Sequence, residues 1–529
     1  MSSKYVQRYE KDVIISYNVY DQCSTKYYNN YIIQIFFAGF DEMNQKKNVL
    51  IVGAGAAGTA AAYSLSKHPE KFKVEVWEKG SVPGGVACSS VVNGDVFVNY
   101  GVQGGTPSYR NTLLLMKEYN FEASPVHMMI SFGKGKTHWT NYAKSPLTQK
   151  LREEIARFEK VLKKINRFEA IYIFVPMHLV LKWYGFSEDF ANEMVFPLTA
   201  LFFGTGNRTP YVSAAIMARV FLDEDLRLFD YDSELLLSQS PDMFAFPNLE
   251  NIYNTILDKI KVKFCPNRPI ASVKRYSDHV IVMDQDGKTA TFDEILFACD
   301  AETALKVIEN PTFLEKKALG NVTYYNDLIL THEDDDYMNE HYEVNKDKDQ
   351  YFVRTDPTDP TKIEMSFNLS NYQPQLKNSK RNIYQTIYLD DNQKERYWTI
   401  DKVNRDKVLL ETWWRQFSHS WTHFAFTVPI MRYLQGKQHT WFCGAYTLIN
   451  THEIAMISGL AAAHRLGAPY PFHHDKLAAK QFDQYLLTIH GQPRAFGFNK
   501  MTLFSCVLGP LMAIFGLFSL ILRCCIRRT

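Results

Sequence analysis

The 529-residue sequence lacks an excess of charge of either sign, a pattern of paired cysteines and any strong compositional bias. Its 59 basic and 57 acidic residues give a formal net charge of +2. A nucleic-acid-binding protein usually has a basic excess, so no nucleic-acid partner is expected. The eight cysteines include no CxxC pair and no metal-ligand spacing, which argues against a disulfide scaffold and predicts no metal site. The 46% hydrophobic and 22% charged fractions are typical of a globular protein rather than a disordered chain.

The longest uncharged apolar run lies near the C-terminus. Residues 501–522 comprise 22 residues without a charge, bounded by Lys500 and Arg523. At about 1.5 Å per residue, a helix of this length spans a hydrocarbon core of about 30 Å. The run therefore predicts a single C-terminal membrane anchor, with a buried core helix as the alternative. The mean hydropathy of the whole chain, −0.25, does not reveal this run, because it averages over 529 residues.

The first 46 residues show no secretory signal. Their apolar run, residues 32–40, is short, contains Gln34 and lies far from the start, unlike the apolar region of a signal peptide. The expected protein is anchored in a membrane by one C-terminal pass, with its catalytic domain in the cytosol. The endoplasmic reticulum and the mitochondrial outer membrane are the expected membranes. The basic tail after residue 522 weakly favours the opposite orientation.

A glycine-rich motif provides the clearest functional signal. The apolar run of residues 48–52 is typical of a buried parallel strand. It leads into Gly53-Ala54-Gly55-Ala56-Ala57-Gly58 and a helical pattern, and a second strand ends at Glu78, 20 residues after Gly58. This spacing matches the dinucleotide-binding fingerprint.

Each glycine of the motif has an expected task. Gly53 allows the tight turn, Gly55 lets the backbone approach a pyrophosphate, and Gly58 lets the helix pack closely on the strand. The helix N-terminus offers free N–H groups and a positive dipole to the phosphates. Glu78 would accept hydrogen bonds from the ribose hydroxyls, so the motif predicts a dinucleotide site.

A glycine pair, Gly84-Gly85, follows Glu78 after a short interval. Here the sequence resembles the flavoprotein superfamily of amine oxidases, phytoene desaturases and protoporphyrinogen oxidases. The resemblance implies FAD rather than NAD as the cofactor, with the glycine pair lining the FAD phosphates. The predicted cofactor-binding residues are Gly53, Gly55, Ala57, Gly58, Glu78, Lys79, Gly84, Gly85, Val273, Gly444, His452 and Glu453.

Two later segments contribute the last four of these residues. Residues 271–283 and 292–299 are predicted to form strands; the resemblance implies that they extend the FAD domain and that the backbone near Val273 touches the adenine. Residues 441–445 lead into an apolar helix that ends near residue 466. The resemblance places Gly444 near the ribityl-phosphate arm and the start of this helix near the flavin. Glu453 either contacts the flavin or, as an acid in the first turn, only complements the dipole of its own helix. His452 is either a helix cap or a neighbour of the flavin.

One subgroup is similar over more of the chain: the amine-oxidase-like FAD proteins related to the flavin domain of plant cyclopropane fatty acid synthases. The similar stretches are 99–111, 292–304 and 440–453, so the likeness covers about residues 46–132, 270–305 and 438–467. The chain departs from the subgroup at Asn99 or Tyr100, where an acid is usual, and at Arg110, where proline is usual. Residues 448–451 also lack the usual glycines and aromatics, so the substrate, or even the activity, can differ from that of the relatives.

The expected fold is α/β: a Rossmann-like FAD-binding domain of the GR2 type, with an inserted α+β substrate cap domain and a C-terminal transmembrane helix. An N-terminal extension (1–46) comes first. The FAD-binding domain comprises 47–132, 256–305 and 438–470, and the cap comprises 133–255 and 306–437. A linker (471–500) and the anchor (501–522) follow. The acidic run 333–336 is expected to lie in a solvated loop.

The resemblance implies an FAD-dependent oxidoreductase. The expected reaction moves hydride from a C–H bond of an apolar or lipid-borne substrate to flavin N5, chemistry that belongs to the cofactor. The alternatives are an amine oxidase acting on a small amine, a polyene desaturase or isomerase, and a non-catalytic escort protein for prenyl lipids of the GDP-dissociation-inhibitor type. No catalytic residue is predicted, and His423 is interpreted as a core histidine. The expected partners are the small-molecule or lipid substrate and the membrane, and the oligomeric state stays open.

Overall fold

The computed structural model describes residues 46–492 except 93, 95, 204–205, 223–228, 239–241, 357, 360–361, 378–380 and 389–398. The predicted anchor, residues 501–522, lies outside this part of the chain. Among the helices that are described, none is both long enough and apolar enough to cross a membrane. The described residues from Asn48 onward belong to one compact unit, which holds the described helices and, apart from Lys47 of β1, the described strands.

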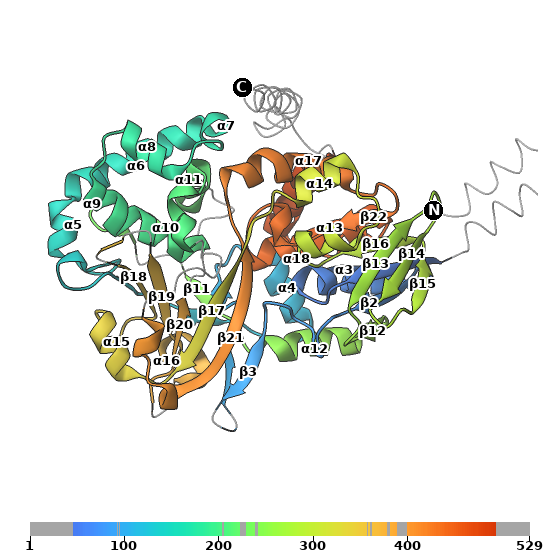
Figure 1. Ribbon diagram of the computed structural model, residues 1–529, viewed down its shortest axis with the longest axis horizontal. Helices are drawn as coiled ribbons and strands as arrows, with labels where there is room; N and C mark the ends of the chain where they lie inside the picture. The colour runs from blue at the N-terminus through green and yellow to red at the C-terminus, as the bar shows by residue number, and fades with distance from the viewer. Residues whose placement is uncertain are drawn as a thin grey trace, which may run out of the picture. The chain divides into compact units, whose positions relative to one another are not determined.

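A five-stranded sheet forms one of the two main layers of strands in the fold (Figure 1). Its order is β12-β2-β1-β16-β22, and the pairs β12–β2, β1–β16 and β16–β22 are parallel. Strands from three separated stretches of the sequence therefore meet in one sheet. The strands are β1 (Lys47–Val52), β2 (Phe72–Trp77), β12 (Lys263–Cys265), β16 (Glu294–Phe297) and β22 (Thr440–Phe442).

Small residues let the helices pack closely beside this sheet. Helix α3 (Ala56–Ser66) is rich in alanine, and α18 (His452–Leu466) and α12 (Leu249–Lys259) pack against it. A methyl group added at Gly459 of α18 would lie 1.9 Å from the carbonyl oxygen of Ala57. The two helices therefore touch backbone to backbone, which only glycine permits at that position.

The second half of the fold is a mixed α and β region built on a seven-stranded sheet. Its order is β21-β17-β20-β19-β18-β7-β8, antiparallel except for the parallel pair β18–β7. The strands are β7 (Ile130–Phe132), β8 (Trp139–Thr140), β17 (Tyr324–His332), β18 (Tyr351–Thr355), β19 (Ile363–Asn368), β20 (Tyr384–Tyr388) and β21 (Val408–Phe417).

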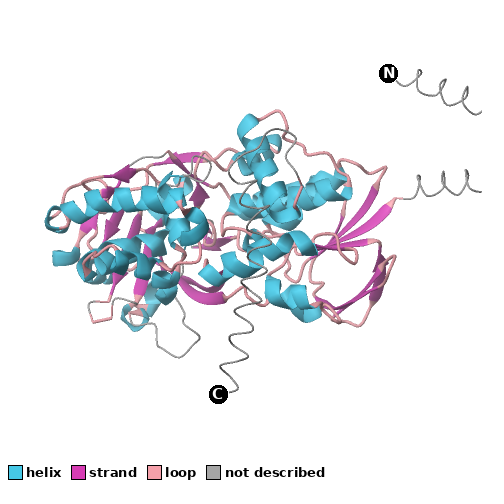
Figure 2. Cartoon of the chain, turned by 90° about the horizontal axis from the view of Figure 1, so that it is seen from above, coloured by secondary structure: helices cyan, strands magenta, loops and turns pink. Residues whose placement is uncertain are grey.

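Helices cover this sheet. Helix α10 packs against β18 and β19, and other helices of the region gather around it (Figures 1 and 2). They are α5 (Pro146–Lys150), α6 (Arg152–Arg167), α7 (Glu169–Tyr172), α8 (Met177–Trp183), α9 (Glu188–Phe190), α10 (Phe196–Phe203) and α11 (Ala214–Leu222). The π-helix η3 (Ala191–Val195) continues α9, η4 (Gly206–Tyr211) is a 3-10 helix, and a second π-helix, η8 (His423–Thr427), follows β21.

Smaller elements complete the described part. Sheets β13-β14-β15, β5-β11-β6, β3-β4 and β10-β9 are formed by β3 (Ser89–Val92), β4 (Val96–Asn99), β5 (Gly104–Gly105), β6 (Ser124–Val126), β9 (Tyr231–Asp232), β10 (Leu236–Leu237), β11 (Met243–Ala245), β13 (Ile270–Arg275), β14 (Val280–Asp284) and β15 (Thr289–Phe292). The remaining helices include α4 (Arg110–Glu118), α13 (Ala301–Val307), α14 (Phe313–Leu319), α15 (Asp335–His341), α16 (Leu369–Tyr372), α17 (Val428–Leu434) and α19 (Lys476–His490).

Several elements lie outside the ranges expected for their domains. Strand β7 belongs to the seven-stranded sheet although it precedes residue 133. Helix α19 lies within the expected linker 471–500 and packs against α17 and α18. The acidic run is not a solvated loop throughout, because Asp334 is 2% exposed. Its carboxylate caps α15 locally, and it also accepts the Asn404 N–H at 2.8 Å and pairs with Lys407 at 3.0 Å, so distant residues help to satisfy this buried charge.

Candidate cofactor and active site

The glycine motif forms a tight turn between β1 and α3. The Gly53 N–H donates to the Trp77 carbonyl oxygen at 2.8 Å, and Gly53 has φ +102°. A methyl group on Gly53 would lie 2.8 Å from the Ala298 carbonyl oxygen, and one on Gly58 would lie 1.9 Å from the Gly53 carbonyl oxygen. Both positions therefore require glycine, one for its left-handed backbone and both for lack of space.

The glycine pair lies directly beside this turn. The Gly84 N–H donates to the Ala54 carbonyl oxygen at 2.9 Å, and Gly84 and Gly85 have φ of +114° and +61°. Gly55 begins α3 without a side-chain cap, and a methyl group there would meet no atom closer than the Gly84 carbonyl oxygen at 3.8 Å. The first amides of α3, including that of Ala57, lack partners within their own helix and suit a phosphate.

Glu78 ends β2 with its carboxylate turned toward the glycine turn. Its Oε2 accepts the Ala54 N–H and its Oε1 accepts the Gly80 N–H, both at 2.8 Å, while the residue is 8% exposed. Each carboxylate oxygen can accept a second hydrogen bond. The two remaining acceptor positions fit ribose hydroxyls, so the residues of this loop fit a dinucleotide. Lys79, the next residue, is exposed.

The strand predicted to touch an adenine approaches this loop at an earlier residue than Val273. The Val273 carbonyl oxygen accepts the Glu309 N–H at 2.9 Å, and the side chain is wholly buried. The Arg268 N–H instead donates to the Glu78 carbonyl oxygen at 2.8 Å. The Arg268 guanidinium lies 3.6 Å from the centroid of a Trp77 ring and pairs with Asp284 at 2.9 Å. Residues just before β13 thus lie beside Glu78, whereas the adenine contact of Val273 stays a prediction.

Gly444 forms the turn after β22, at the same carboxyl edge of the sheet as Gly53. It has φ +137°, and its N–H donates to the Ser458 hydroxyl of α18 at 2.8 Å. Ligands of open α/β sheets bind beyond the carboxyl ends of the strands. The structure therefore brings Gly53, Gly55, Gly84 and Gly444 to the edge where a cofactor would lie.

Glu453 ties α18 to the first turn of α4. Its Oε1 accepts the backbone and side-chain N–H groups of Asn111 at 2.7 and 2.8 Å, and its Oε2 accepts the backbone N–H and the hydroxyl of Thr112 at 2.9 and 2.6 Å. Burial raises the pKa of this carboxyl group, and the four hydrogen bonds oppose that rise. Because all four acceptor positions are filled, no acceptor position remains on the carboxylate for a flavin.

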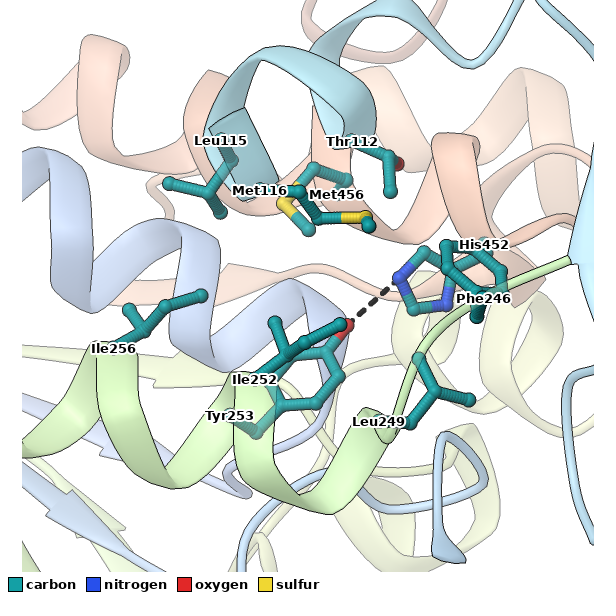
Figure 3. A pocket seen from close by; sticks show the side chains of 10 residues that line it. All are labelled: Thr112, Leu115, Met116, Phe246, Leu249, Ile252, Tyr253, Ile256, His452 and Met456. Carbon is teal, nitrogen blue, oxygen red and sulfur yellow. Dashed lines mark hydrogen bonds between the residues drawn. The ribbon is translucent and has the colours of Figure 1, made fainter. Parts of the chain in front are cut away.

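His452 faces α12 across a small apolar pocket (Figure 3). Its Nε2 lies 2.7 Å from the Tyr253 hydroxyl, and burial lowers the pKa of the imidazole to about 4. The pocket is lined by Thr112, Leu115, Met116, Phe246, Leu249, Ile252, Tyr253, Ile256, His452 and Met456. These contacts place the side chain in the packing between α4, α12 and α18.

A buried polar group that the sequence did not reveal lies near Gly444. We call His419, His423 and Tyr446 the histidine cluster. The His423 Nε2 lies 2.6 Å from the Tyr446 carbonyl oxygen and donates to it. The His419 Nε2 accepts the Asn450 N–H at 2.8 Å. The two rings therefore carry their protons on different nitrogens, and the ring of Phe417 lies 5.0 and 5.2 Å from them.

Two polar atoms of the histidine cluster are left for a ligand. Within the described residues, the His423 Nδ1 and the Tyr446 hydroxyl have no hydrogen-bond partner, although both are buried. Burial lowers the pKa of His423 to about 4 and raises that of Tyr446 well above its usual range. At neutral pH the cluster thus offers an uncharged acceptor and an uncharged phenol. An unsatisfied buried polar atom is costly, which indicates a partner from outside the chain.

The histidine cluster lies next to the sheet edge. A methyl group on Gly444 would lie 3.1 Å from the Tyr446 ring. The nearby Tyr324 hydroxyl accepts the Ala301 N–H of α13 at 2.7 Å, and Tyr324 and Cys299 act electrostatically on Tyr446. His423 was interpreted from the sequence as a core histidine. It is buried, but only one of its nitrogens is used.

Comparison with known proteins supports the fold. A family model described as "NAD(P)-binding Rossmann-like domain" matches residues 51–119. Comparison with curated protein sequences found no significant match.

Similar solved structures cover 80% of the chain. They include a CLA-producing fatty acid isomerase from P. acnes (13% identity, TM-score 0.58, 99% of that chain) and a putative protoporphyrinogen oxidase from Exiguobacterium sp. 255-15 (12%, 0.60, 99%). A cyclohexylamine oxidase from Brevibacterium oxydans is similar as well (12%, 0.57, 100%). The chain has the fold of these enzymes, so the fold expected from the resemblance to amine oxidases and protoporphyrinogen oxidases is confirmed.

Proposed function

We propose that the chain is an FAD-dependent oxidoreductase of the amine-oxidase-like type. The observation that carries the proposal is the loop of Gly53, Gly55 and Gly58 beside Gly84, with Glu78 holding two free acceptor positions at its edge. FAD, when bound, would supply an acceptor for hydride. The fold supports this reading because it is shared with oxidases of two kinds.

The chain's own residues would bind the cofactor, orient the substrate and shield the reacting bond from water. Gly444 is tied to α18 through Ser458, which would fix the turn that the resemblance places near the ribityl-phosphate arm. The neutral His423 Nδ1 can accept a hydrogen bond from a substrate, and the Tyr446 hydroxyl can donate one. The aromatic and apolar surroundings of the cluster would keep water away from the reacting bond.

We propose an apolar or lipid-borne substrate. The neutral state of the histidine cluster and the fold shared with a fatty acid isomerase support this choice. The proposed location is a membrane, reached through the anchor at residues 501–522, with the folded part in the cytosol. A small amine and a polyene remain the alternative substrates. Glu78, the glycine pair and Gly444 disfavour an escort protein, since a protein that does not use flavin has no need of them.

The cofactor test uses the purified full-length chain and its absorbance at about 450 nm. A yellow protein is expected. A colourless protein that cannot be reconstituted with FAD would overturn the proposal. The variant Glu78→Ala should bind FAD at least about ten-fold more weakly, because two ribose contacts are lost. Glu75→Ala on the same strand, where Glu75 pairs with Lys263 at 3.0 Å, is the matched control.

The substrate test measures bleaching of the flavin without oxygen. Lipid extract should bleach it faster than a series of aliphatic amines. Bleaching by amines alone would contradict a lipid substrate and leave the oxidoreductase assignment in place.

A further inference from the structure

Exposed apolar side chains occur on α7 and the residue before it, on α8 and on the 3-10 helix η4. The exposed fractions are 45% for Phe168, 64% for Ile171, 62% for Trp183 and 54% for Tyr211. We call these four residues the apolar cap surface. Soluble proteins expose large apolar residues singly, and a group of them indicates an interaction site.

Side-chain contacts hold these elements together. The Tyr172 and Tyr184 hydroxyls lie 2.7 Å apart and join α7 to the end of α8. The His178 Nδ1 lies 2.8 Å from the Pro210 carbonyl oxygen, and its ring lies 5.0 Å from that of Tyr211. Figure 1 shows α6, α7 and α8 next to one another. The elements that carry the four apolar residues are therefore connected and form one part of the cap region.

Positive charge borders the apolar cap surface. The basic residues between positions 160 and 183 are Lys160, Lys163, Lys164, Arg167 and Lys182. The acidic residue in this stretch is Glu169, which pairs with Arg219, and Lys163 pairs with Glu159 just before it, so the excess of positive charge comes from Lys160, Lys164, Arg167 and Lys182. The Lys164 ammonium lies 5.2 Å from the centroid of the Tyr184 ring, and the Arg167 guanidinium lies 5.6 Å from that of Phe168. Long basic side chains beside tryptophan and tyrosine are the pattern of a membrane interface.

We propose that the apolar cap surface docks onto a lipid bilayer with anionic headgroups. Trp183 and Ile171 would enter the interface, while the basic residues of α6 contact the headgroups. The charge favours this occupant over a neutral protein surface, and the uncharged run 501–522 would hold the chain at the same bilayer.

The docked surface would lie beside the histidine cluster. The Ser213 hydroxyl donates to the Ile173 carbonyl oxygen at 2.8 Å, and the Ser213 N–H donates to the His419 carbonyl oxygen at 3.5 Å. Val212 forms a bridge with Ser420. A single residue thus separates the exposed segment from the cluster. A lipid substrate taken up at this surface would therefore lie close to the cluster, a consequence that rests on the proposed function.

The test introduces p-benzoylphenylalanine at Ile171, Trp183 or Trp413 of the full chain. Trp413 of β21 is a matched control because it is 55% exposed. Each protein is reconstituted into phosphatidylcholine vesicles with or without about one fifth phosphatidylserine and irradiated. Mass spectrometry then measures lipid adducts. The adduct yield should be at least about ten-fold higher at positions 171 and 183 than at 413, and phosphatidylserine should raise it.

Charge variants test whether the surface binds anionic lipid headgroups. The double variant Lys164→Glu/Arg167→Glu should lose about ten-fold or more of its adducts with phosphatidylserine vesicles, since each basic group near such a surface adds to binding. Lys71→Glu/Lys261→Glu, two exposed residues elsewhere, should not.

Four results would overturn the docking surface. They are equal yields at the three positions, cross-links only to a second copy of the chain, cross-links only to another protein, and failure to associate with vesicles. Flavin absorbance of the same samples separates the two proposals. A colourless protein with lipid adducts refutes the FAD assignment alone, whereas a yellow protein without adducts refutes the docking surface alone.

Discussion

Replacing Glu453 by alanine should destabilise the folded chain strongly. The carboxylate is 4% exposed and accepts four hydrogen bonds from Asn111 and Thr112. The two side-chain donors can turn away, but the two backbone N–H groups cannot. A buried unsatisfied donor costs about 1–3 kcal/mol, so two of them cost about 2–6 kcal/mol, less the relief of no longer burying a charge. We expect about 3 kcal/mol, a large share of a typical stability of about 5–15 kcal/mol.

Urea unfolding of the full chain, followed by circular dichroism, measures this loss. Glu453→Gln keeps one carbonyl oxygen for one pair of donors, so it should lose about half as much. Glu302→Ala is the matched control, because Glu302 is also in the first turn of a helix but its side chain is 64% exposed. Its loss should stay within about 1 kcal/mol. Equal midpoints for Glu453→Ala and Glu302→Ala would refute the reasoning. A shifted flavin spectrum in Glu453→Gln would instead restore a flavin contact.

The other predictions concern packing, pH and substrate. Gly459→Ala should lower the free energy of unfolding by about 3 kcal/mol, because the new methyl group would lie 1.9 Å from the Ala57 carbonyl oxygen; a stabilised variant, as expected for an unhindered helix site, would contradict this close contact. Burial lowers the pKa of His332 and His423 to about 4 and that of His490 to about 3. In the unfolded chain the pKa of each histidine is near 6.5, so below that pH the unfolded state takes up protons that the folded state does not. The free energy of unfolding should therefore be highest above about pH 6.5 and fall as the pH drops toward 4. Urea midpoints that stay constant from pH 7 to 4.5 would contradict the shifts. His423→Phe should keep its flavin absorbance but slow bleaching by substrate about ten-fold, whereas an unchanged rate would remove His423 from the substrate site.

Local patterns allowed the nucleotide loop to be predicted from the sequence. Gly53, Gly58 and Glu78 act within one strand–helix–strand unit, and their spacing alone specifies the turn and the acid beside it. The strand of residues 48–52 was also accessible, because a strand covered on both faces is continuously apolar. The resemblance implied that residues 271–283 and 292–299 extend the FAD domain; residues 294–297 do join the five-stranded sheet, whereas β13 and β14 form a separate sheet with β15.

Contacts between distant residues could not be predicted in this way. Glu453 meets Asn111 and Thr112 more than 300 positions away in the sequence, so a first-turn acid of α18 gave no hint of its role on α4. His423 and Tyr446 likewise meet only in the folded chain. From the sequence, Asp334 was expected to be solvated. In the structure it is buried and pairs with Lys407, which lies 73 positions later in the chain. In each case the partner, rather than the residue type, decides whether a polar group is structural, functional or exposed.

Helix α18 connects the separate parts of the proposed cofactor site. Its Gly459 touches α3, its Ser458 holds the Gly444 turn, and its Glu453 holds α4. The glycine motif near residue 53 is therefore complete only after residues about 400 positions later have docked. Pairings of such long sequence separation form late and slowly. Because a bound cofactor stabilises only the docked state, FAD should raise the unfolding midpoint of the whole chain in proportion to the logarithm of its concentration. A midpoint independent of added FAD would mean that α18 is docked for reasons other than the cofactor site.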